Sequence, residues 1–558
     1  MKNRIYLTLV VIQLVVTTGF SQDMVWHNVI AGQSEEYGNA IAIDNLGNVI
    51  TTGSFRTICY GDGFALSSYG NSDIFLQKLS PNGAVIWVTQ FGGVNSDIGH
   101  TVVTDSLGNI YVAGTFLGTV FFGTASLSSG TSSSNFFLLK LNPAGEIIWR
   151  KAIPGTISDK PKLAIDANDN LFLSGAFQGS RSFDGITLNS NNGRGYLAKI
   201  NSDTANIMWA TQFGSGTTLN GQPVVVNVTT THIAVDNLGN IYVTGCFAGH
   251  GRFGTETFLS PNSLSNAYIA KINGQGVFQW TKLYTGTSEG TSIVVDSNNN
   301  IYTAGKYSGT VTINNTTYTT EPSIYSVYLE KFNANGDLVW IKNYNMNSSE
   351  NSIVIPQLAI DSQANLFFKC HFYNTITFEG NTYNHLVSLN PNILKNQILA
   401  TFSSGGANTW VNQYEGSNDH ITFGLRPDKN TNIAITEAGL FFTSGSSRFN
   451  NVSYSLESGA NIFTAKLTLP FLLSQPDFIK NDWVQLSPNP TNGRVVLDFK
   501  AVSSTVDVLI YNAVGQKINQ LNYQGMERIE IDLPSQNGVY LFDIRSDNQR
   551  VIKKVVKN

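Results

Sequence analysis

Charged side chains are scarce in this chain of 558 residues. They make up 13% of the sequence, about half of the roughly 25% that is usual in soluble proteins. The few charges nearly cancel, with a formal net charge of −4 and a sequence pI of about 6.0. Because nucleic-acid binding usually needs a basic patch or stripe, this composition gives no support for a nucleic-acid partner.

Cysteine is equally scarce, with three copies at Cys59, Cys246 and Cys370. The count is odd, and each cysteine falls in a different copy of the repeat described below. Cysteines in separate repeats should lie beyond the limit of about 7 Å between Cα atoms that a disulfide requires. We therefore interpret all three as small buried apolar residues rather than as a metal or redox site.

The signatures of common catalytic sites are also missing. The sequence has no Gly-x-Ser-x-Gly elbow, no His-Glu-x-x-His pair and no phosphate-binding loop. Its seven histidines are scattered, and none is paired at a metal-ligand spacing. The sequence predicts no bound metal or cofactor, and it favours a protein that is not an enzyme.

Only one long apolar run occurs, from Ile5 to Val16. It follows the basic residues Lys2 and Arg4, and small residues suited to cleavage come after it, a pattern typical of a secretory signal peptide at residues 1–21. The run is shorter than the roughly 20 apolar residues of a membrane span, and no other stretch reaches that length. We expect an exported protein without a transmembrane segment.

What the sequence has in abundance is one repeated phrase. An apolar strand, then Asp-x-x-Gly-Asn, then Ile-Tyr-Val-x-Gly-x-Phe recurs at spacings of about 60 to 75 residues, which indicates a repeat architecture. The anchor positions are Asp44, Asp105, Asp166, Asp236, Asp296 and Asp361, with a degenerate seventh copy at Thr436. The spacing does not match a calcium loop, so we expect each aspartate to cap its own hairpin turn.

Each repeat divides into four strands, as in the second copy at residues 101–104, 110–116, 136–141 and 146–152. A lysine in the third strand and a tryptophan in the fourth recur together. These pairs are Lys78/Trp87, Lys140/Trp149, Lys199/Trp209, Lys271/Trp280 and Lys331/Trp340. Four-stranded repeats predict propeller blades, and the tryptophans should pack between neighbouring sheets.

The two ends of the repeat region complement each other. The seventh copy stops after a third strand that carries Lys466, whereas the segment around Trp26 looks like a fourth strand without a third. We predict that the N-terminal strand completes the last blade and closes an all-β, seven-bladed propeller over residues 22–469. Closure would also remove exposed sheet edges. The sixth-to-seventh junction is irregular, and we expect Trp410 to lie in an insertion there.

The repeats resemble the bacterial β-propeller repeat family called SBBP, which occurs in secreted and surface proteins. The resemblance rests on Gly-Asn-Ala-Ile-Ala-Ile-Asp-Asn-Leu-Gly-Asn (38–48) and Ile-Ala-Val-Asp-Asn-Leu-Gly-Asn-Ile-Tyr-Val-Thr-Gly (233–245). It implies the propeller fold and says little about activity.

The composition changes after Leu469, where residues 470–485 form a predicted linker to a second module at residues 486–558. This module opens with Leu-Ser-Pro-Asn-Pro-Thr-Asn-Gly, continues through Asn-Gly-Val-Tyr (537–540) and closes with Lys-Lys-Val-Val-Lys (553–557). It resembles the type A C-terminal sorting domain of the Bacteroidetes type IX secretion system. The resemblance implies a small β-sandwich, recognition by the type IX machinery and delivery to the cell surface or the medium. A plain immunoglobulin-like adhesive domain is the alternative.

Acidic residues recur in the loop before the first strand of several blades. They are Glu36, Asp97, Asp159, Glu289 and Glu350. These loops should gather at one mouth of the central channel, where a ring of carboxylates could attract a cation or a basic or hydroxyl-rich ligand. The alternative is that each acid accepts hydrogen bonds from loop amides and locks neighbouring blades together.

These features predict a secreted or cell-surface binding or adhesion scaffold. Its partners would be the type IX machinery and an extracellular glycan or protein ligand. A secreted polysaccharide hydrolase or lyase, with acids at the channel mouth, is the alternative function.

Overall fold

The computed structural model describes residues 24–557 except 33, 35, 130–133, 156–159, 217, 220–221, 224–226, 261–264, 349–355, 362, 373–374, 385–395, 417–438, 445–446, 450–451, 454–461, 469–483, 513–516 and 547–548. All regular elements in these residues are β-strands, so none is a helix able to cross a membrane. The chain divides into two compact units, Met1–Leu472 and Leu473–Asn558. The predicted signal peptide and Thr436 lie outside the described residues.

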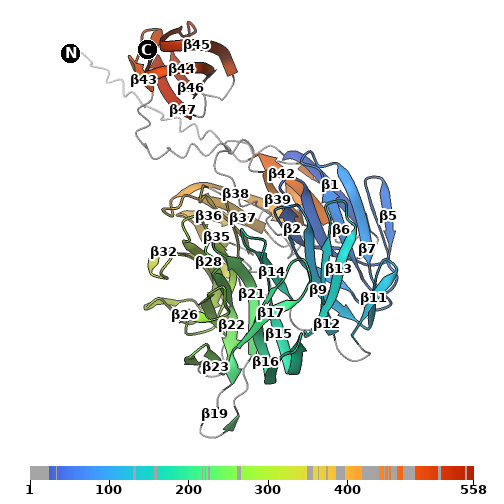
Figure 1. Cartoon of the computed structure of the whole chain (residues 1–558). Coiled ribbons are helices and arrows are strands. Elements are labelled where there is room, and N and C mark those ends of the chain that lie inside the picture. The colour runs from blue at the N-terminus through green and yellow to red at the C-terminus, as the bar shows by residue number, and fades with distance from the viewer. Residues whose placement is uncertain are drawn as a thin grey trace, which may run out of the picture. The chain divides into compact units, whose positions relative to one another are not determined.

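Six sheets of the first unit repeat one plan, in which four strands pair antiparallel in chain order (Figure 1). Blade 1 contains β2 (Tyr37–Ile43), β3 (Val49–Phe55), β6 (Asp73–Leu79) and β7 (Val85–Phe91). Blade 2 contains β8 (Ile98–Thr104), β9 (Ile110–Leu117), β12 (Ser134–Leu141) and β13 (Ile147–Ile153). Blade 3 contains β14 (Lys162–Ile165), β15 (Leu171–Phe183), β16 (Ile186–Ile200) and β17 (Ile207–Phe213).

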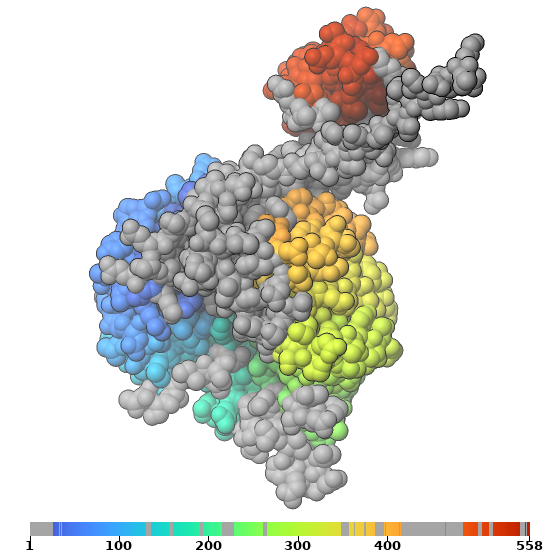
Figure 2. All heavy atoms as spheres, turned by 180° about the vertical axis from the view of Figure 1, so that it is seen from behind, coloured from blue at the N-terminus to red at the C-terminus, as the bar shows by residue number. Residues whose placement is uncertain are grey.

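The remaining three sheets follow the same order. Blade 4 contains β21 (Asn227–Val235), β22 (Ile241–Ala248), β25 (Asn266–Ile272) and β26 (Phe278–Leu283). Blade 5 contains β27 (Ser288–Val295), β28 (Ile301–Ser308), β31 (Tyr325–Phe332) and β32 (Leu338–Ser348). Blade 6 contains β33 (Gln357–Ile360), β34 (Leu366–Phe372), β37 (Asn396–Phe402) and β38 (Asn408–Gly416). In Figure 2 the colours follow this order around the unit, from blue through green to orange.

A closing sheet brings together the two ends of the first unit. Its strands are β39 (Gly439–Ser444), β42 (Ile462–Thr468) and β1 (Met24–Gly32), in that order. The antiparallel pairing of β1 with β42 sets Trp26 opposite Lys466, as the sequence predicts. The first and last strands of this unit therefore lie side by side (Figure 1).

Trp410 lies in a regular strand, so its predicted place in an insertion is wrong. It belongs to β38, the fourth strand of blade 6, and pairs with Thr401 of β37. Thr401 occupies the third-strand position that holds lysine in blades 1 to 5, and this replacement hid the repeat in the sequence.

Short hairpins connect the second and third strands of most blades. They are β4 (Ile58–Gly61) with β5 (Phe64–Ser67), β10 (Thr119–Phe122) with β11 (Ala125–Ser128), β23 (His250–Phe253) with β24 (Glu256–Leu259), β29 (Thr310–Ile313) with β30 (Thr316–Thr319), β35 (Thr375–Phe378) with β36 (Asn381–Asn384), and β40 (Ser447–Phe449) with β41 (Val452–Ser453). In blade 3 the extended β15 and β16 form the same hairpin. Before blade 4, β19 (Thr218–Leu219) and β20 (Gln222–Pro223) form a further small hairpin, and β18 (Ser215–Gly216) pairs with β23.

Most of these hairpins pair or bridge with the preceding sheet, whereas that of blade 3 continues its own sheet. The hairpin of blade 1 pairs with the end of β1 at Ala31 and Tyr60, and that of blade 6 pairs with β32 at Met346 and Ile376. The apolar clusters likewise combine residues from adjacent blades, as where Leu76 of blade 1 packs with Val112 of blade 2. The core of this unit therefore lies between sheets. Cys59 and Cys370 are buried in such clusters, as interpreted from the sequence, whereas Cys246 is only half-buried, so its predicted burial is wrong.

The second unit is a sheet of five strands around one apolar cluster. These are β43 (Val484–Ser487), β44 (Arg494–Asn512), β45 (Lys517–Asp532), β46 (Gly538–Ser546) and β47 (Gln549–Lys557). Strands β43, β44, β46 and β47 pair in that order, and β45 pairs with β44. The Pro-Asn-Pro-Thr segment fastens the last strand, because Val556 donates its backbone N–H to Asn489 Oδ1 (2.8 Å) and accepts one from Thr491 (2.8 Å).

Candidate functional site

The anchor aspartates cap their own turns, which confirms the structural reading of the Asp-x-x-Gly-Asn phrase. Asp44 Oδ1 accepts the backbone N–H groups of Leu46 and Asn48 (both 2.9 Å), and its Oδ2 accepts the side-chain amide of Asn48 (2.8 Å). Burial works to raise the pKa of Asp44, but hydrogen bonds from Lys78 and Asn48 outweigh it and hold that pKa below its usual value. The same three bonds recur at Asp105, Asp166, Asp236, Asp296 and Asp361.

The recurring lysines and tryptophans join neighbouring blades. Trp87 Nε1 and Lys78 Nζ of blade 1 both donate to the carbonyl oxygen of Pro143 in blade 2, at 3.2 and 3.0 Å. Trp149 with Lys140, and Trp340 with Lys331, converge in the same way on the carbonyls of Ser202 and Ser404. The predicted packing of the tryptophans between sheets is thus confirmed, and these polar groups are already used by the scaffold.

Trp26 makes the same contact across the chain ends. Its Nε1 donates to the carbonyl of Pro81 in blade 1 (2.8 Å), and its ring lies against Gly83, where a Cβ atom would fall 2.5 Å from the indole. Gly83 also needs its positive φ of 84°, which glycine adopts without strain. The N-terminal strand therefore docks onto blade 1 as the fourth strand of blade 1 docks onto blade 2.

Two of the five predicted loop acids are buried where sheets meet. Glu36 is 1% exposed and lies by Gly32, at the end of β1, while Asp97 is 0% exposed and lies by Gly93, after blade 1. No described residue reaches the oxygens of Asp97 with good hydrogen-bond geometry. Burial raises the pKa of Asp97 to about 7, against a smaller lowering effect of the Gly93 and Leu117 amides.

Glu289 occupies a different position from these two acids. Glu289 precedes its anchor aspartate by seven residues, whereas Glu36 and Asp97 precede theirs by eight. Because side chains of successive strand residues point to opposite faces, this difference of one residue turns Glu289 to the other face. Ser288, rather than Glu289, is equivalent to Asp97. The backbone N–H groups of Ser288 and Asp97 each donate to the carbonyl of the residue that precedes the third strand of the preceding blade. Glu289 instead forms an ion pair with Lys306 of β28 (3.3 Å).

The remaining two acids, Asp159 and Glu350, lie outside the described residues. The three described acids lie at three separate junctions between sheets, and within the described part of the chain they form no group that could hold a metal ion. A channel-mouth ligand site built from all five stays a prediction.

Glu330 is a buried acid that the sequence reading missed. It is 0% exposed and accepts hydrogen bonds from the hydroxyls of Tyr284 and Thr303 and from the Asn314 amide (2.8 Å). Burial raises its pKa to about 7, although these three donors act against the shift. Tyr284 follows blade 4 and Asn314 belongs to the hairpin of blade 5, so Glu330 is a junction residue as well.

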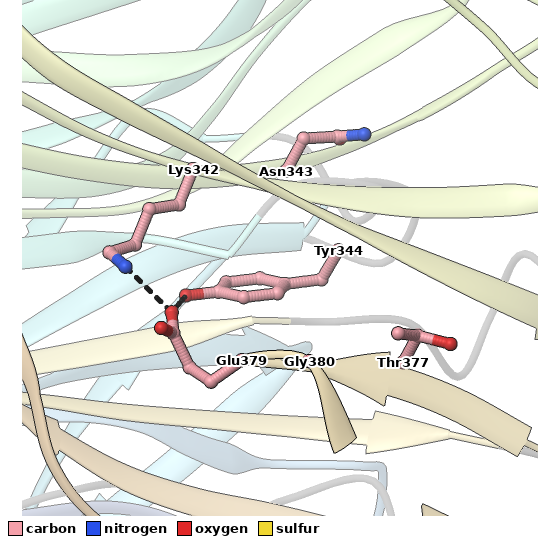
Figure 3. Close-up of a pocket in the computed structure, with 6 residues that line it drawn as sticks. All are labelled: Lys342, Asn343, Tyr344, Thr377, Glu379 and Gly380. Carbon is pink, nitrogen blue, oxygen red and sulfur yellow. Dashed lines mark hydrogen bonds and ion pairs between the residues drawn. The ribbon is translucent and has the colours of Figure 1, made fainter. Parts of the chain in front are cut away.

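An open pocket of about 320 Å³ lies between β32 of blade 5 and the hairpin of blade 6 (Figure 3). Its lining residues are Lys342, Asn343, Tyr344, Thr377, Glu379 and Gly380. The Lys342 ammonium and the Tyr344 hydroxyl both meet Glu379 Oε1, each at 2.7 Å. Burial, and then the bond to Glu379, raise the pKa of Tyr344, so its hydroxyl is the donor.

The sequence carried a weak signal for this pocket. Lys342 follows the repeat tryptophan Trp340 by two residues, and Glu379-Gly380 forms the turn of the following hairpin. Blades 2 and 3 contain a similar pair, in which Lys151 meets Asp184 at 2.6 Å. Recognising the pair required knowing that the hairpin folds back onto the preceding blade.

Comparison with known families finds a match to one segment in each part of the chain. Residues 485–558 match the model described as a secretion system C-terminal sorting domain, and residues 86–119 match a β-propeller repeat. The chain carries a type IX secretion sorting domain. This domain indicates a secreted or cell-surface protein, and the repeat match agrees with the strand order of the six blades.

Individual relatives are distant. An uncharacterized WD repeat-containing protein, L264, of Acanthamoeba polyphaga mimivirus is 24% identical over 277 residues, covering 41% of this chain. The chain matches only 19% of that protein's length. Among solved structures, a protein of unknown function from Bacteroides caccae is 11% identical with a TM-score of 0.25, covering 60% of this chain and 94% of its own. A europium-containing methanol dehydrogenase is 10% identical with a TM-score of 0.35, covering 80% and 93%.

Proposed function

We propose that this protein is a binding or adhesion scaffold at the cell surface, exported by the type IX secretion system. In this proposal residues 1–21 are a signal peptide, residues 22–469 a closed seven-bladed propeller, and residues 470–485 a linker. Residues 486–558 form a small β-sandwich that the secretion machinery recognises. The ligand is an extracellular glycan or protein.

The observation that carries the seven-bladed ring is the contact of Trp26 with blade 1. The closing sheet docks onto blade 1 through the same tryptophan-to-carbonyl bond that joins blades 1 and 2. Added to six four-stranded blades, the closing sheet makes the seventh unit of one ring. Such a ring leaves no terminal blade with an exposed apolar face.

A scaffold fits the described acids better than a polysaccharide hydrolase or lyase does. Glycoside hydrolysis commonly needs two carboxyl groups about 5–10 Å apart that flank a bound substrate. Glu36 and Asp97 are buried at different junctions, and Glu289 is paired with Lys306. Buried carboxyl groups cannot flank a bound polysaccharide, and Glu289 is already ion-paired, so the proposal rests on binding rather than turnover.

Deletion of Leu486–Asn558 tests the export route. The truncated chain should fail to reach the cell surface or the medium, while the full chain is found there by fractionation and immunoblotting. Substituting the exposed Met526 of the same unit, which is 45% exposed, by Gln is the control and should leave export unchanged. Surface delivery of the truncated chain would refute the sorting role.

Binding is tested with the purified full chain on arrays of glycans and extracellular matrix proteins. We expect saturable retention of at least one class of ligand, without release of smaller products from polysaccharides. Product release that Asp97→Asn abolishes would instead identify an enzyme.

A further inference from the structure

We propose that the pocket between β32 and the β35–β36 hairpin binds a neutral, hydroxyl-rich ligand, such as the terminal sugar of an extracellular polysaccharide. The inference rests on the proposed binding function and gives it a location. The lining residues are the six drawn in Figure 3, with Lys342 and Tyr344 directed toward Glu379.

The carboxylate of Glu379 is positioned before any ligand arrives. Lys342 and Tyr344 both bind its Oε1, and no described residue hydrogen-bonds its Oε2. The Tyr344 ring is itself fixed, because it is 3% exposed and stacks on Phe378 with centroids 4.2 Å apart. A polar group that is held in place loses little conformational entropy on binding, so Oε2 is a prepared hydrogen-bond acceptor.

The charges of the pocket favour a neutral ligand. The Lys342 ammonium and the Glu379 carboxylate are both about one quarter exposed and neutralise each other. Tyr344 stays protonated, since its pKa lies above the usual value. With no net charge, the pocket lacks the excess of cations that would select phosphate or sulfate, and it lacks the cluster of carboxylates that would select a metal ion.

The groups left over match the chemistry of hydroxyl groups. Glu379 Oε2 accepts hydrogen bonds, the Lys342 ammonium donates, and the exposed Thr377 hydroxyl can do both. A sugar hydroxyl also donates and accepts, so neighbouring hydroxyls can satisfy this set together. A volume of about 320 Å³ is at the small end of the usual 300–1,000 Å³ for ligand sites, which suits one small molecule or the end of a chain.

The corresponding junction of blades 2 and 3 lacks this arrangement. There Asp184 Oδ2 meets the Lys151 ammonium and also accepts the backbone N–H of Ile207 (2.8 Å). The residue equivalent to Tyr344 is Ile153, which cannot donate a hydrogen bond. The two junctions share the ion pair and differ in the tyrosine, so Asp184 supplies a matched control.

Saturation-transfer NMR on the full chain with a panel of neutral monosaccharides and disaccharides tests the site. At least one sugar should bind wild type saturably. Glu379→Gln should weaken it at least tenfold, about 1.4 kcal/mol, because the charged acceptor is lost. Thr377→Phe should abolish binding by filling the pocket, and it changes a side chain that is exposed rather than packed in a core. Asp184→Asn breaks the other ion pair and should leave the affinity within twofold.

Three outcomes would overturn the assignment. They are no saturable sugar in the panel, unchanged affinity in Thr377→Phe, or tighter binding of glucuronate or inorganic phosphate than of any neutral sugar. The array experiment separates this failure from that of the scaffold. Retention of a matrix protein without sugar binding would refute the sugar site and keep the proposed scaffold function. No retention of any ligand would refute both proposals.

Discussion

The buried carboxyl group of Asp97 should lower the stability of the folded chain by an amount that depends on pH. Its carboxyl group is 0% exposed, and its oxygens lack a well-formed hydrogen bond to the described residues. The nearby carboxyl of Asp73 adds like charge and is also buried. Because the charged form is poorly solvated here, the protonated form is favoured in the folded protein.

The pKa of Asp97 predicts a change in stability between about pH 4 and pH 7. The folded value is about 7 and the ordinary value 3.8, so the folded chain holds an extra proton in this window and loses stability as the pH rises through it. Asp97→Asn stays neutral at every pH. Its melting temperature should exceed that of wild type above about pH 7, and the difference should vanish near pH 4.

Thermal unfolding followed by circular dichroism across that range measures the effect. Asp203→Asn is the control, because the Asp203 side chain is 86% exposed and should change the profile little. Parallel profiles for Asp97→Asn and wild type would contradict a buried, protonated Asp97.

The sequence could locate these acids but not their orientation. Glu36 and Asp97 precede their anchors by eight residues and Glu289 by seven. The inner strands also contain a bulge, as between Gly99 and Thr101, which shifts the alternation of faces. A spacing that looks nearly constant along the chain therefore separates buried side chains from an ion-paired one.

At the level of elements, a tryptophan of one blade and a turn glycine of the next form a clasp. Gly145 of blade 2 has a φ of 87°, and a Cβ atom there would lie 3.0 Å from the indole of Trp87. Glycine thus gives the turn its conformation and the ring its space. The turn carbonyl of Pro143 then receives the indole N–H.

We expect Trp87→Ala and Gly145→Ala to destabilise the protein less in combination than the sum of their separate effects. Trp87→Ala should cost about 2–3 kcal/mol through lost packing and the lost hydrogen bond. Gly145→Ala should add steric conflict with the ring to the strain of its positive φ. Once the ring is removed, only that strain remains.

Urea unfolding of the two single variants and the double variant gives the coupling energy. Gly63→Ala is the matched control, since its φ is 77° and no atom lies within 4 Å of the added Cβ. It isolates the cost of the conformation. Strictly additive effects would argue against a clasp.

The sequence predicted the four strands and the packing of the tryptophans between sheets, because period-2 alternation and the Trp/Lys pairs repeat clearly, but it did not predict the contact with the turn glycine. It did not predict that the hairpins of blades 1 and 6 pair with the preceding sheet. The strands of most hairpins have about four residues each, which is too short for a clear sequence pattern. The pairing of Met346 with Ile376 is set by the relative position of two blades. The pocket beside Glu379 depends on that pairing, so it could not be foreseen either.

On the scale of the whole molecule, neighbouring blades of the first unit are joined by several separate sets of contacts. In the first strands of blades 1 and 5, the side chains of Asn39 and Thr291 lie at bulges and donate to the next blade at Gly99 and Pro356 (2.8 and 2.6 Å). The fourth-strand tryptophans add hydrogen bonds to the next blade, and hairpins add strand pairing with the preceding blade. Because each blade depends on its neighbours, closing the ring should make all blades unfold together.

A comparison of Trp26→Ala with Trp149→Ala tests this closure. Both remove an indole N–H bond to the next blade, from Trp26 to Pro81 and from Trp149 to Ser202. In a closed ring the two junctions are equivalent, so both variants should lower the main calorimetric transition by similar amounts and keep it single. In an open array the N-terminal strand would fray separately, and Trp26→Ala would leave the main transition where it was. Hydrogen exchange adds a local reading, because β42 amides that face β1 should gain exchange only together with the other blades if the ring is closed.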